Sequence, residues 1–182
     1  MARRKKEDPS VHQNRIADQA EKLFGSKGIE STSMDDIAKA AEYSKATLYV
    51  YFKNKEDIVS FLTLRSMSAL KSVLSDVIEK KKNSRETFLG IGFALADFQE
   101  NSPVFFERSL DYISIDFDEN EDDYLSQTYL IGNEINEVIA EFIECGVKNN
   151  EIRNFANSFV LTYIWVVFKN LCECLIKGKG LC

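Results

Sequence analysis

Proline is almost absent from this chain, and this constrains the fold more than any other feature. Only two prolines, Pro9 and Pro103, occur among 182 residues, together with eight glycines. Proline breaks helices, and the sequence has no strand-like alternation of apolar and polar residues, so long helices can form almost everywhere. We therefore expect an all-α fold without internal repeats.

Capping residues and apolar periodicity divide the chain into helices. Ser33 with Asp36 makes a pair that resembles a capping box, and Ser44 and Asn54 are N-caps for the next two helices. Gly28 is suited to a left-handed helix end. We expect helices over residues 11–27, 34–41, 45–52, 55–81, 85–100, 103–115, 124–149 and 154–177, with an acidic loop at 116–123. In the helix over 55–81, the apolar stripe is predicted to comprise Ile58, Phe61, Leu62, Arg65, Ala69, Val73 and Val77.

The charge is distributed unevenly. The formal net charge is -6, but the first 60 residues hold 11 Lys+Arg against 10 Asp+Glu, and the remainder holds 12 against 19. The front includes the basic run Arg3-Arg4-Lys5-Lys6. A neutral front on an acidic body fits a head that reads DNA and a separate acidic domain. The alternative is a solvated surface without a binding role.

Several classes of protein are disfavoured. No apolar leader follows the charged N-terminus, and the most hydrophobic stretch, 159–176, is interrupted by Lys169, Asn170 and Glu173. We expect a cytoplasmic protein that does not associate with membranes. An enzyme is also disfavoured, because the chain has one histidine, no nucleophile–base pairing and no glycine-rich phosphate loop.

The cysteines predict no metal site and no cofactor. They form no CxxC pair, and His12, the single histidine, lies far from them in the sequence. In a reducing compartment they are most often core or surface thiols, and a redox sensor is the alternative. The four are Cys145, Cys172, Cys174 and Cys182.

The segment SKATLYVYFKNKED, from Ser44 to Asp57, has the composition of a short helix that enters the DNA major groove. On a helical wheel, Leu48 and Phe52 face inward. Ala46, Tyr49, Val50 and Lys53 face outward, with Lys45 and Thr47 flanking them at the start of the helix.

The outward residue types suit base edges and phosphates. A small alanine permits close approach to the bases; alanine, valine and threonine methyl groups can touch a thymine methyl, and a threonine hydroxyl can bond a base edge. Hydroxyl groups and cations suit phosphates: Ser44, Tyr49, Tyr51 and Lys55. Ser33 and Met34 open the preceding helix, where a helix end commonly meets the phosphate wall. The alternative is an ordinary corner between two helices.

The segment from Arg15 to Ile58 resembles the DNA-binding domain of the TetR family of bacterial repressors. The matching features are Phe24 and Gly28 at the end of the first helix, the hydroxyl-rich stretch 31–33, the pair 37–38, and the pattern LYxYFxxKE over 48–56. Two positions depart from the family, which usually has glycine at the position of Glu42 and often at that of Ala46. If the turn keeps its left-handed geometry, Glu42 is strained there.

The resemblance implies which residues meet DNA. They are those at the positions of Ser44, Lys45, Ala46, Thr47, Tyr49, Val50, Tyr51 and Lys55. The basic tail from Ala2 to Lys6 could add contacts as a flexible arm, or could merely aid solubility. The DNA-binding domain is then expected over residues 1–54, and the effector-binding and dimerisation domain over 55–182.

The resemblance also implies a homodimer paired through the last two helices and a pocket for a small effector. Broad apolar faces on these helices fit the pairing, although a purely internal core is the alternative. The predicted interface residues are Ile135, Ile139, Phe142, Phe159, Tyr163, Val167 and Leu171. The candidate pocket residues are Phe88, Phe93, Phe105, Tyr112, Tyr129 and Trp165.

The expected function is therefore a repressor that binds a palindromic DNA operator as a dimer and is released by a small effector, which is hydrophobic in the leading interpretation. Acidic residues near the predicted pocket leave a cationic effector open. The alternatives are a ligand-independent or activating helix-turn-helix regulator and a dimeric helical adaptor.

Overall fold

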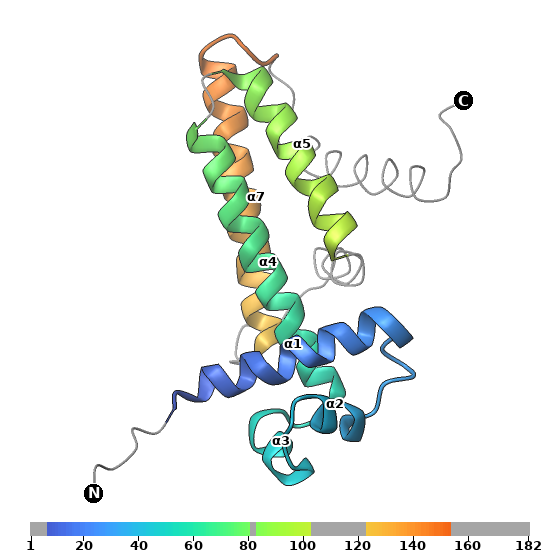
Figure 1. Ribbon diagram of the computed structural model, residues 1–182. Coiled ribbons are helices and arrows are strands. Elements are labelled where there is room, and N and C mark those ends of the chain that lie inside the picture. Colours follow the sequence, from blue (N-terminus) through green and yellow to red (C-terminus); the bar gives the residue numbers. More distant parts are fainter. Residues whose placement is uncertain (1–6, 81–82, 103–122, 154–182) are drawn as a thin grey trace, which may run out of the picture. The chain divides into compact units, whose positions relative to one another are not determined.

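The structure, a computed structural model, describes residues 7–80, 83–102 and 123–153 (Figure 1). These residues form helices and no strands, which confirms the all-α expectation. The helices are α1 (Pro9–Lys27), α2 (Met34–Ala40), α3 (Lys45–Tyr51), α4 (Lys55–Lys80), α5 (Ser84–Asn101) and α7 (Tyr124–Lys148). The helices predicted over 103–115 and 154–177 and the loop at 116–123 lie outside the described residues.

The chain divides into two compact units, Met1–Leu62 and Thr63–Cys182. The boundary lies within α4 because the first turns of that helix help to fill the core of the first unit. Ile58, Val59 and Leu62 are buried there, and the ring of Phe61 packs edge-on against that of Phe52. The functional division after residue 54 that the sequence suggested stays a prediction.

The first unit packs α1, α2 and α3 around one core. These helices are amphipathic, so each buries one stripe against the other two. The buried apolar residues before α4 are Ile16, Ala17, Ala20, Phe24, Ile37, Ala38, Leu48 and Phe52. The core therefore fixes α3 through Leu48 and leaves the opposite face of that helix outside.

Local capping sets where these helices begin. Ser33 accepts a hydrogen bond from the backbone of Asp36, and the Asp36 side chain accepts one from the Ser33 backbone, so the predicted capping box is present. Ser44 caps α3 by accepting from the Thr47 backbone. Asn54 accepts from the Asp57 backbone at 2.8 Å, as expected for the cap of α4. Each cap accepts a hydrogen bond from a backbone N–H group that has no partner within the helix.

Two turns of the first unit use left-handed backbone. Gly28 ends α1 with φ 84° and ψ 158°, a combination that is open essentially to glycine alone. Glu42, between α2 and α3, has φ 61°. The turn therefore keeps the left-handed geometry although this chain lacks the glycine, and Glu42 bears the steric cost.

In the second unit α4, α5 and α7 share a core. The buried members are Met67, Leu70, Leu74, Ile91, Leu95, Ile135, Ile139 and Ile143. The stripe predicted for the later part of α4 was wrong at two positions: Ala69 and Val73 are exposed, and Met67, Leu70 and Leu74 point inward instead. Val77, also predicted, packs against the core. At about 100° per residue, positions 67, 70 and 74 fall within about 60° of one another on the helix, whereas positions 69 and 73 lie roughly 90° or more from the middle of that face.

A close approach of backbone segments closes one end of the second unit. A Cβ atom placed on Gly146 of α7 would lie 2.5 Å from Cδ1 of Ile152 and 2.9 Å from Oγ of Ser84. Glu151 accepts a hydrogen bond of 2.8 Å from the backbone of Ser84, which lowers the pKa of its carboxyl group. Glycine at 146 thus lets the turn after α7 contact the start of α5.

No helix among the described residues is both long enough and apolar enough to cross a bilayer.

Candidate nucleic-acid interface

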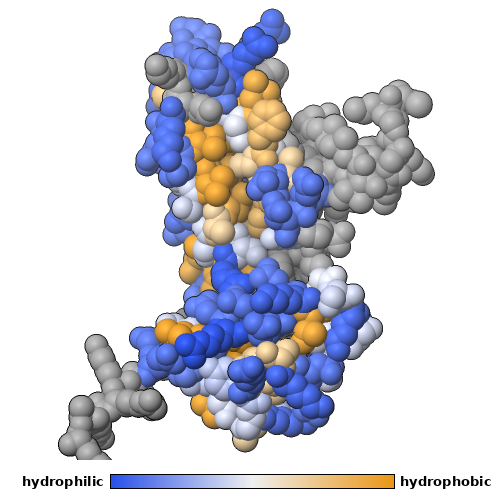
Figure 2. Space-filling model, in the orientation of Figure 1, coloured by the Kyte–Doolittle hydropathy of each residue, from blue (hydrophilic) through white to orange (hydrophobic). Residues whose placement is uncertain are grey.

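The outward face of α3 is small and apolar in its centre. Ala46, Tyr49 and Val50 are exposed, with Tyr49 at 46% and Val50 at 77% of full exposure. Leu48 and Phe52 are buried on the other side, as the helical wheel predicted. In Figure 2 the lower tip of the first unit, where Figure 1 shows α3, carries hydrophobic as well as hydrophilic surface.

The hydroxyl groups around α3 are already hydrogen-bonded. The Ser44 and Thr47 hydroxyls share a hydrogen bond of 2.7 Å, and the Ser44 oxygen also accepts from the Thr47 backbone at 3.0 Å. The Ser33 hydroxyl donates to the Asp36 carboxylate at 2.6 Å, while Met34, the first residue of α2, is half-buried. Ser33, Ser44 and Thr47 therefore serve first as parts of caps.

The two lysines among the predicted DNA-contacting residues, Lys45 and Lys55, are also engaged. Nζ of Lys45 lies 2.8 Å from the carboxylate of Asp35, and this hydrogen bond and the negative charge raise the pKa of Lys45. Nζ of Lys55 donates to the backbone carbonyl of Ile29 at 2.7 Å. The pair of Lys45 with Asp35 is exposed, so another anion can replace Asp35 as the partner of Lys45 at a small cost in free energy. Lys55 instead ties the start of α4 to the connection between α1 and α2.

Sequence reasoning missed a brace between α1 and the two short helices. Nδ1 of His12 makes a 2.7 Å hydrogen bond with the hydroxyl of Tyr43, and the His12 ring packs on that of Tyr51 at 5.3 Å between centroids. Arg15 pairs with Glu7 at 3.1 Å, and its pKa is raised by a hydrogen bond to Tyr43 and by the charge of Glu7. Because these residues lie 31 or more positions apart, no periodicity relates His12 to Tyr43 and Tyr51.

The ten predicted DNA-contacting residues thus fall into two groups. Ser33, Ser44, Thr47, Tyr51 and Lys55 make contacts that hold the helices in place, and Met34 is half-buried. Lys45, Ala46, Tyr49 and Val50 are exposed on α3. A short helix with one small, apolar exposed face and a lysine at its start has the size and chemistry to enter a major groove.

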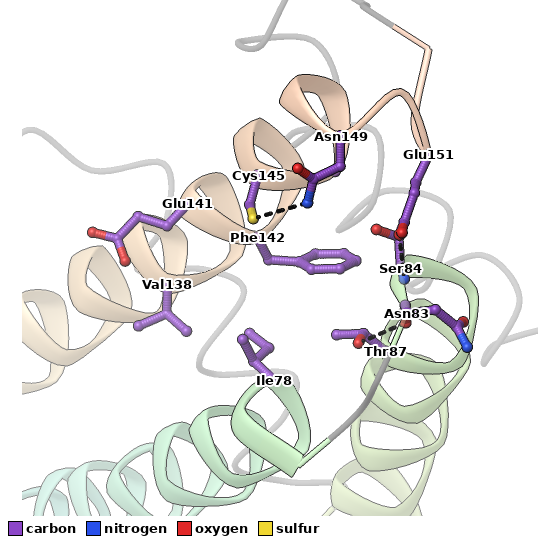
Figure 3. A pocket seen from close by; sticks show the side chains of 11 residues that line it. Ile78, Asn83, Ser84, Thr87, Val138, Glu141, Phe142, Cys145, Asn149 and Glu151 are labelled. Carbon is purple, nitrogen blue, oxygen red and sulfur yellow. Dashed lines mark hydrogen bonds between the residues drawn. The ribbon is translucent and has the colours of Figure 1, made fainter.

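The second unit contains a pocket of about 390 Å³ between the ends of α4, α5 and α7 (Figure 3). Ile78, Val138 and Phe142 supply its apolar wall. Glu141 and Glu151 are its only charged lining residues within the described part of the chain, and both are carboxylates. Glu151 is held by the backbone of Ser84, so Glu141 is the carboxylate left to interact with a bound molecule.

Residues 16–60 match the family model described as "Bacterial regulatory proteins, tetR family". This stretch covers α2, α3 and nearly all of α1, together with the start of α4. This stretch of the chain is therefore similar to the TetR family.

Two curated relatives match part of the chain. The chain is 40% identical to the HTH-type transcriptional regulator AcrR of Shigella flexneri over 60 residues, which are 33% of this chain and 28% of AcrR. It is 44% identical to the biofilm operon icaADBC negative transcriptional regulator IcaR of Staphylococcus epidermidis over 45 residues, 25% of this chain and 24% of IcaR. The chain therefore matches about a quarter of the length of each of these relatives.

Solved structures show that the likeness in fold extends beyond this region. The fatty acid degradation regulator FadR of Bacillus halodurans has a TM-score of 0.70 at 15% identity, covering 97% of this chain and 90% of that one. FadR of Bacillus subtilis in complex with stearoyl-CoA has a TM-score of 0.65 at 18% identity, covering 92% and 89%. At such identities the likeness concerns the fold alone. All four of these proteins are named as regulators.

The predicted effector residues that the structure describes do not line the pocket in Figure 3. Phe88 and Phe93 are 51% and 73% exposed on α5. Tyr129 is half-buried on α7. Phe105, Tyr112 and Trp165 lie outside the described residues. No periodic signal distinguished the observed lining, which comes from three helix ends and a turn.

The predicted dimer residues divide in a similar way. Ile135 and Ile139 are buried in the core of the second unit, where they pack within one chain. Phe142 is half-buried and lines the pocket. Phe159, Tyr163, Val167 and Leu171 lie outside the described residues, as does the basic tail from Ala2 to Lys6. Of the predicted interface residues, the structure therefore describes three, and none of them is exposed.

Proposed function

We propose that the chain is a transcriptional repressor that binds a palindromic operator as a homodimer and is released from it by a small effector. α3 is the recognition helix in this proposal, and the two copies of α3 in a dimer would occupy successive major grooves. Half-sites about 34–36 Å apart, or a multiple of that, would match such a pair. Since its target is DNA, we place the protein in the cytoplasm.

The main observation behind this proposal is that α3 is fixed on one side by contacts within the chain and exposed on the other. Capping by Ser44, burial of Leu48 and the His12 contact with Tyr51 all fix the helix from behind. On the other side of α3, Ala46, Tyr49 and Val50 are exposed, and contacts with the described residues do not account for these residue types. The match to the tetR family model over this same region supports DNA as the partner.

Release requires that the effector favour a form of the protein that binds DNA poorly, because equal affinity for both forms would shift nothing. α4 contributes to both units, and its first residue, Lys55, is bonded to the carbonyl of Ile29. A displacement of α4 would therefore disturb the connection before α2. We propose α4 as the element through which the effector acts.

The pocket in Figure 3 favours an effector with an apolar body and without negative charge. Its wall holds Ile78, Val138 and Phe142, and its charged lining residues, Glu141 and Glu151, would repel phosphate groups. The stearoyl-CoA ligand of the Bacillus subtilis structure carries phosphates, so it does not suit this pocket. A hydrophobic or cationic molecule fits the lining better.

The test is a binding titration of the full-length protein with duplexes selected from a random-sequence library. We expect a retained duplex to bind with an affinity that falls by roughly 10³-fold or more between 50 and 200 mM salt if at least six phosphates are contacted. Lys45→Ala should make the salt dependence shallower, whereas Lys148→Ala on α7 removes an equal charge and should leave it unchanged.

Sedimentation of the same preparation should give twice the mass of the chain. A preparation that is monomeric and selects no duplex would overturn the proposal. If the protein is dimeric and binds no duplex, the adaptor alternative holds instead.

A further inference from the structure

The exposed face of α3 lacks the side chains that most often identify bases by hydrogen bonds. Paired hydrogen bonds to guanine come from arginine or lysine, those to adenine from asparagine or glutamine, and cytosine is read by acidic residues. The helix sequence KATLYVY contains no arginine, asparagine, glutamine, aspartate or glutamate. Direct reading of base edges by this helix must therefore depend on other groups.

The remaining polar groups of α3 are poorly placed to read bases. The Thr47 hydroxyl is satisfied by Ser44 at 2.7 Å, and Tyr51 is packed on His12. Lys45 is held 2.8 Å from Asp35 at the edge of the helix. When it leaves this pair, a flexible point charge suits a phosphate better than a single base. Tyr49 ends in one hydroxyl, which can reach a phosphate as readily as a base.

Two apolar side chains remain at the centre of the face. Ala46 and Val50 are four residues apart, so they lie on the same side of α3, one above the other. Val50 is 77% exposed, which means that packing within the chain does not explain a valine there. Valine is also a poorer helix former than alanine, so local structure does not favour it either.

We propose that Ala46 and Val50 are specificity-determining residues that recognise the C5 methyl groups of thymines in the operator. This inference depends on the proposed DNA-binding function and adds the chemistry of its readout. Each half-site carries thymines facing these two residues. Val50 buries a thymine methyl group, and Ala46 gives the space for the helix to come close enough. Cytosine at the same place has only a hydrogen on C5, so the valine would lose the methyl contact.

The experiment removes the methyl group and nothing else. An operator duplex is first selected from a random library with the full-length protein, and each thymine is then replaced by deoxyuridine, symmetrically in both half-sites. Base pairing and hydrogen-bonding groups stay the same. We expect one or two positions per half-site at which affinity falls about fourfold for each methyl group lost, or roughly 15-fold for the symmetric pair.

Variants of the protein assign the effect to a side chain. In Val50→Ala the loss on deoxyuridine substitution should shrink to less than twofold at one position, because the interacting partner is gone. Val73→Ala removes the same atoms from an exposed valine of α4 and should keep the full loss. Circular dichroism checks that both variants keep their helices.

Two results would overturn the inference while leaving the proposed function intact. One is an operator that tolerates deoxyuridine at every position, and the other is an equal loss in the native protein and Val50→Ala. If the library yields no retained duplex, both the proposed function and this inference fail. A loss that is confined to the native protein and the Val73→Ala control supports the inference.

Discussion

The ammonium group of Lys45 lies 2.8 Å from the carboxylate of Asp35, so the first turn of α3 is paired with the first turn of α2. The pair joins the only basic residue of α3 to an acidic residue at the surface. DNA phosphates would compete with Asp35 for Lys45. The pair thus holds the cation in place before binding and also opposes the approach of an anionic partner.

Asp35→Asn should therefore tighten binding to all duplexes. We expect a gain of about two- to fivefold, which is the range for an exposed ion pair, together with a steeper dependence on salt. Fluorescence anisotropy with selected and scrambled duplexes measures both. Asp97→Asn on α5 makes the same change in net charge. If it tightens binding equally, the effect comes from net charge and not from the pair.

Glu42→Gly should stabilise the first unit. Glu42 has φ 61°, where an L-residue bears a steric cost of roughly 1–2 kcal/mol, and glycine bears none. The greater freedom of glycine in the unfolded chain takes back part of this gain, so we expect a net increase of about 0.5–1 kcal/mol in the free energy of unfolding. Urea titration measures it. Asn150→Gly, at φ 57°, should gain less because asparagine tolerates this region. Equal gains would contradict the steric explanation.

The capping box of α2 should make the stability of the folded protein depend on pH. Hydrogen bonds from Ser33 and the nearby Lys27 hold the pKa of Asp36 well below its ordinary value of 3.8. A depressed pKa means that the stabilisation is complete above the ordinary value and is lost as the pH falls below it. Asp36→Asn should thus lower the melting temperature by the same amount at pH 7 and pH 5. The difference should narrow below about pH 4. A difference that is unchanged at pH 3 would refute this linkage.

Replacing either of two glycines of α7 by alanine should change the stability of the protein in opposite directions. At Gly146 the new methyl group would lie within 3 Å of both Ile152 and Ser84, so we expect a loss of about 1–3 kcal/mol in the free energy of unfolding. At Gly132 the nearest atom, Cε of Met67, is 3.9 Å away. Gly132→Ala should therefore gain about 0.5–1 kcal/mol from helix propensity. Denaturant unfolding of both variants measures these changes. A loss of stability at both positions would mean that the space around the new methyl group does not determine the effect.

The helices and their caps could be predicted from the sequence because both are decided locally. The capping pair Ser33 and Asp36 and the cap at Asn54 each depend on residues three positions apart. The inward direction of Leu48 and Phe52 follows from the spacing of apolar residues alone. The expected helix ends consequently agree with the structure to within one or two residues wherever it describes them.

The partners of the polar side chains could not be predicted, because they depend on how helices pack. Lys55 and Ile29 are 26 positions apart, and no pattern relates them. The sequence therefore assigned Lys55 to a phosphate, while the structure shows it bonded to a backbone carbonyl. The buried side of α4 was misread for another reason: this helix carries apolar residues on several sides, so periodicity alone did not select Leu70 and Leu74 over Val73.

A recognition helix that senses a methyl group has a consequence for modified DNA. Cytosine methylated at carbon 5 carries this group at the same place in the major groove as thymine does. The exposed valine of α3 would then discriminate between methylated and unmodified copies of one sequence. Occupancy of the operator would follow the epigenetic state of the genome as well as its sequence.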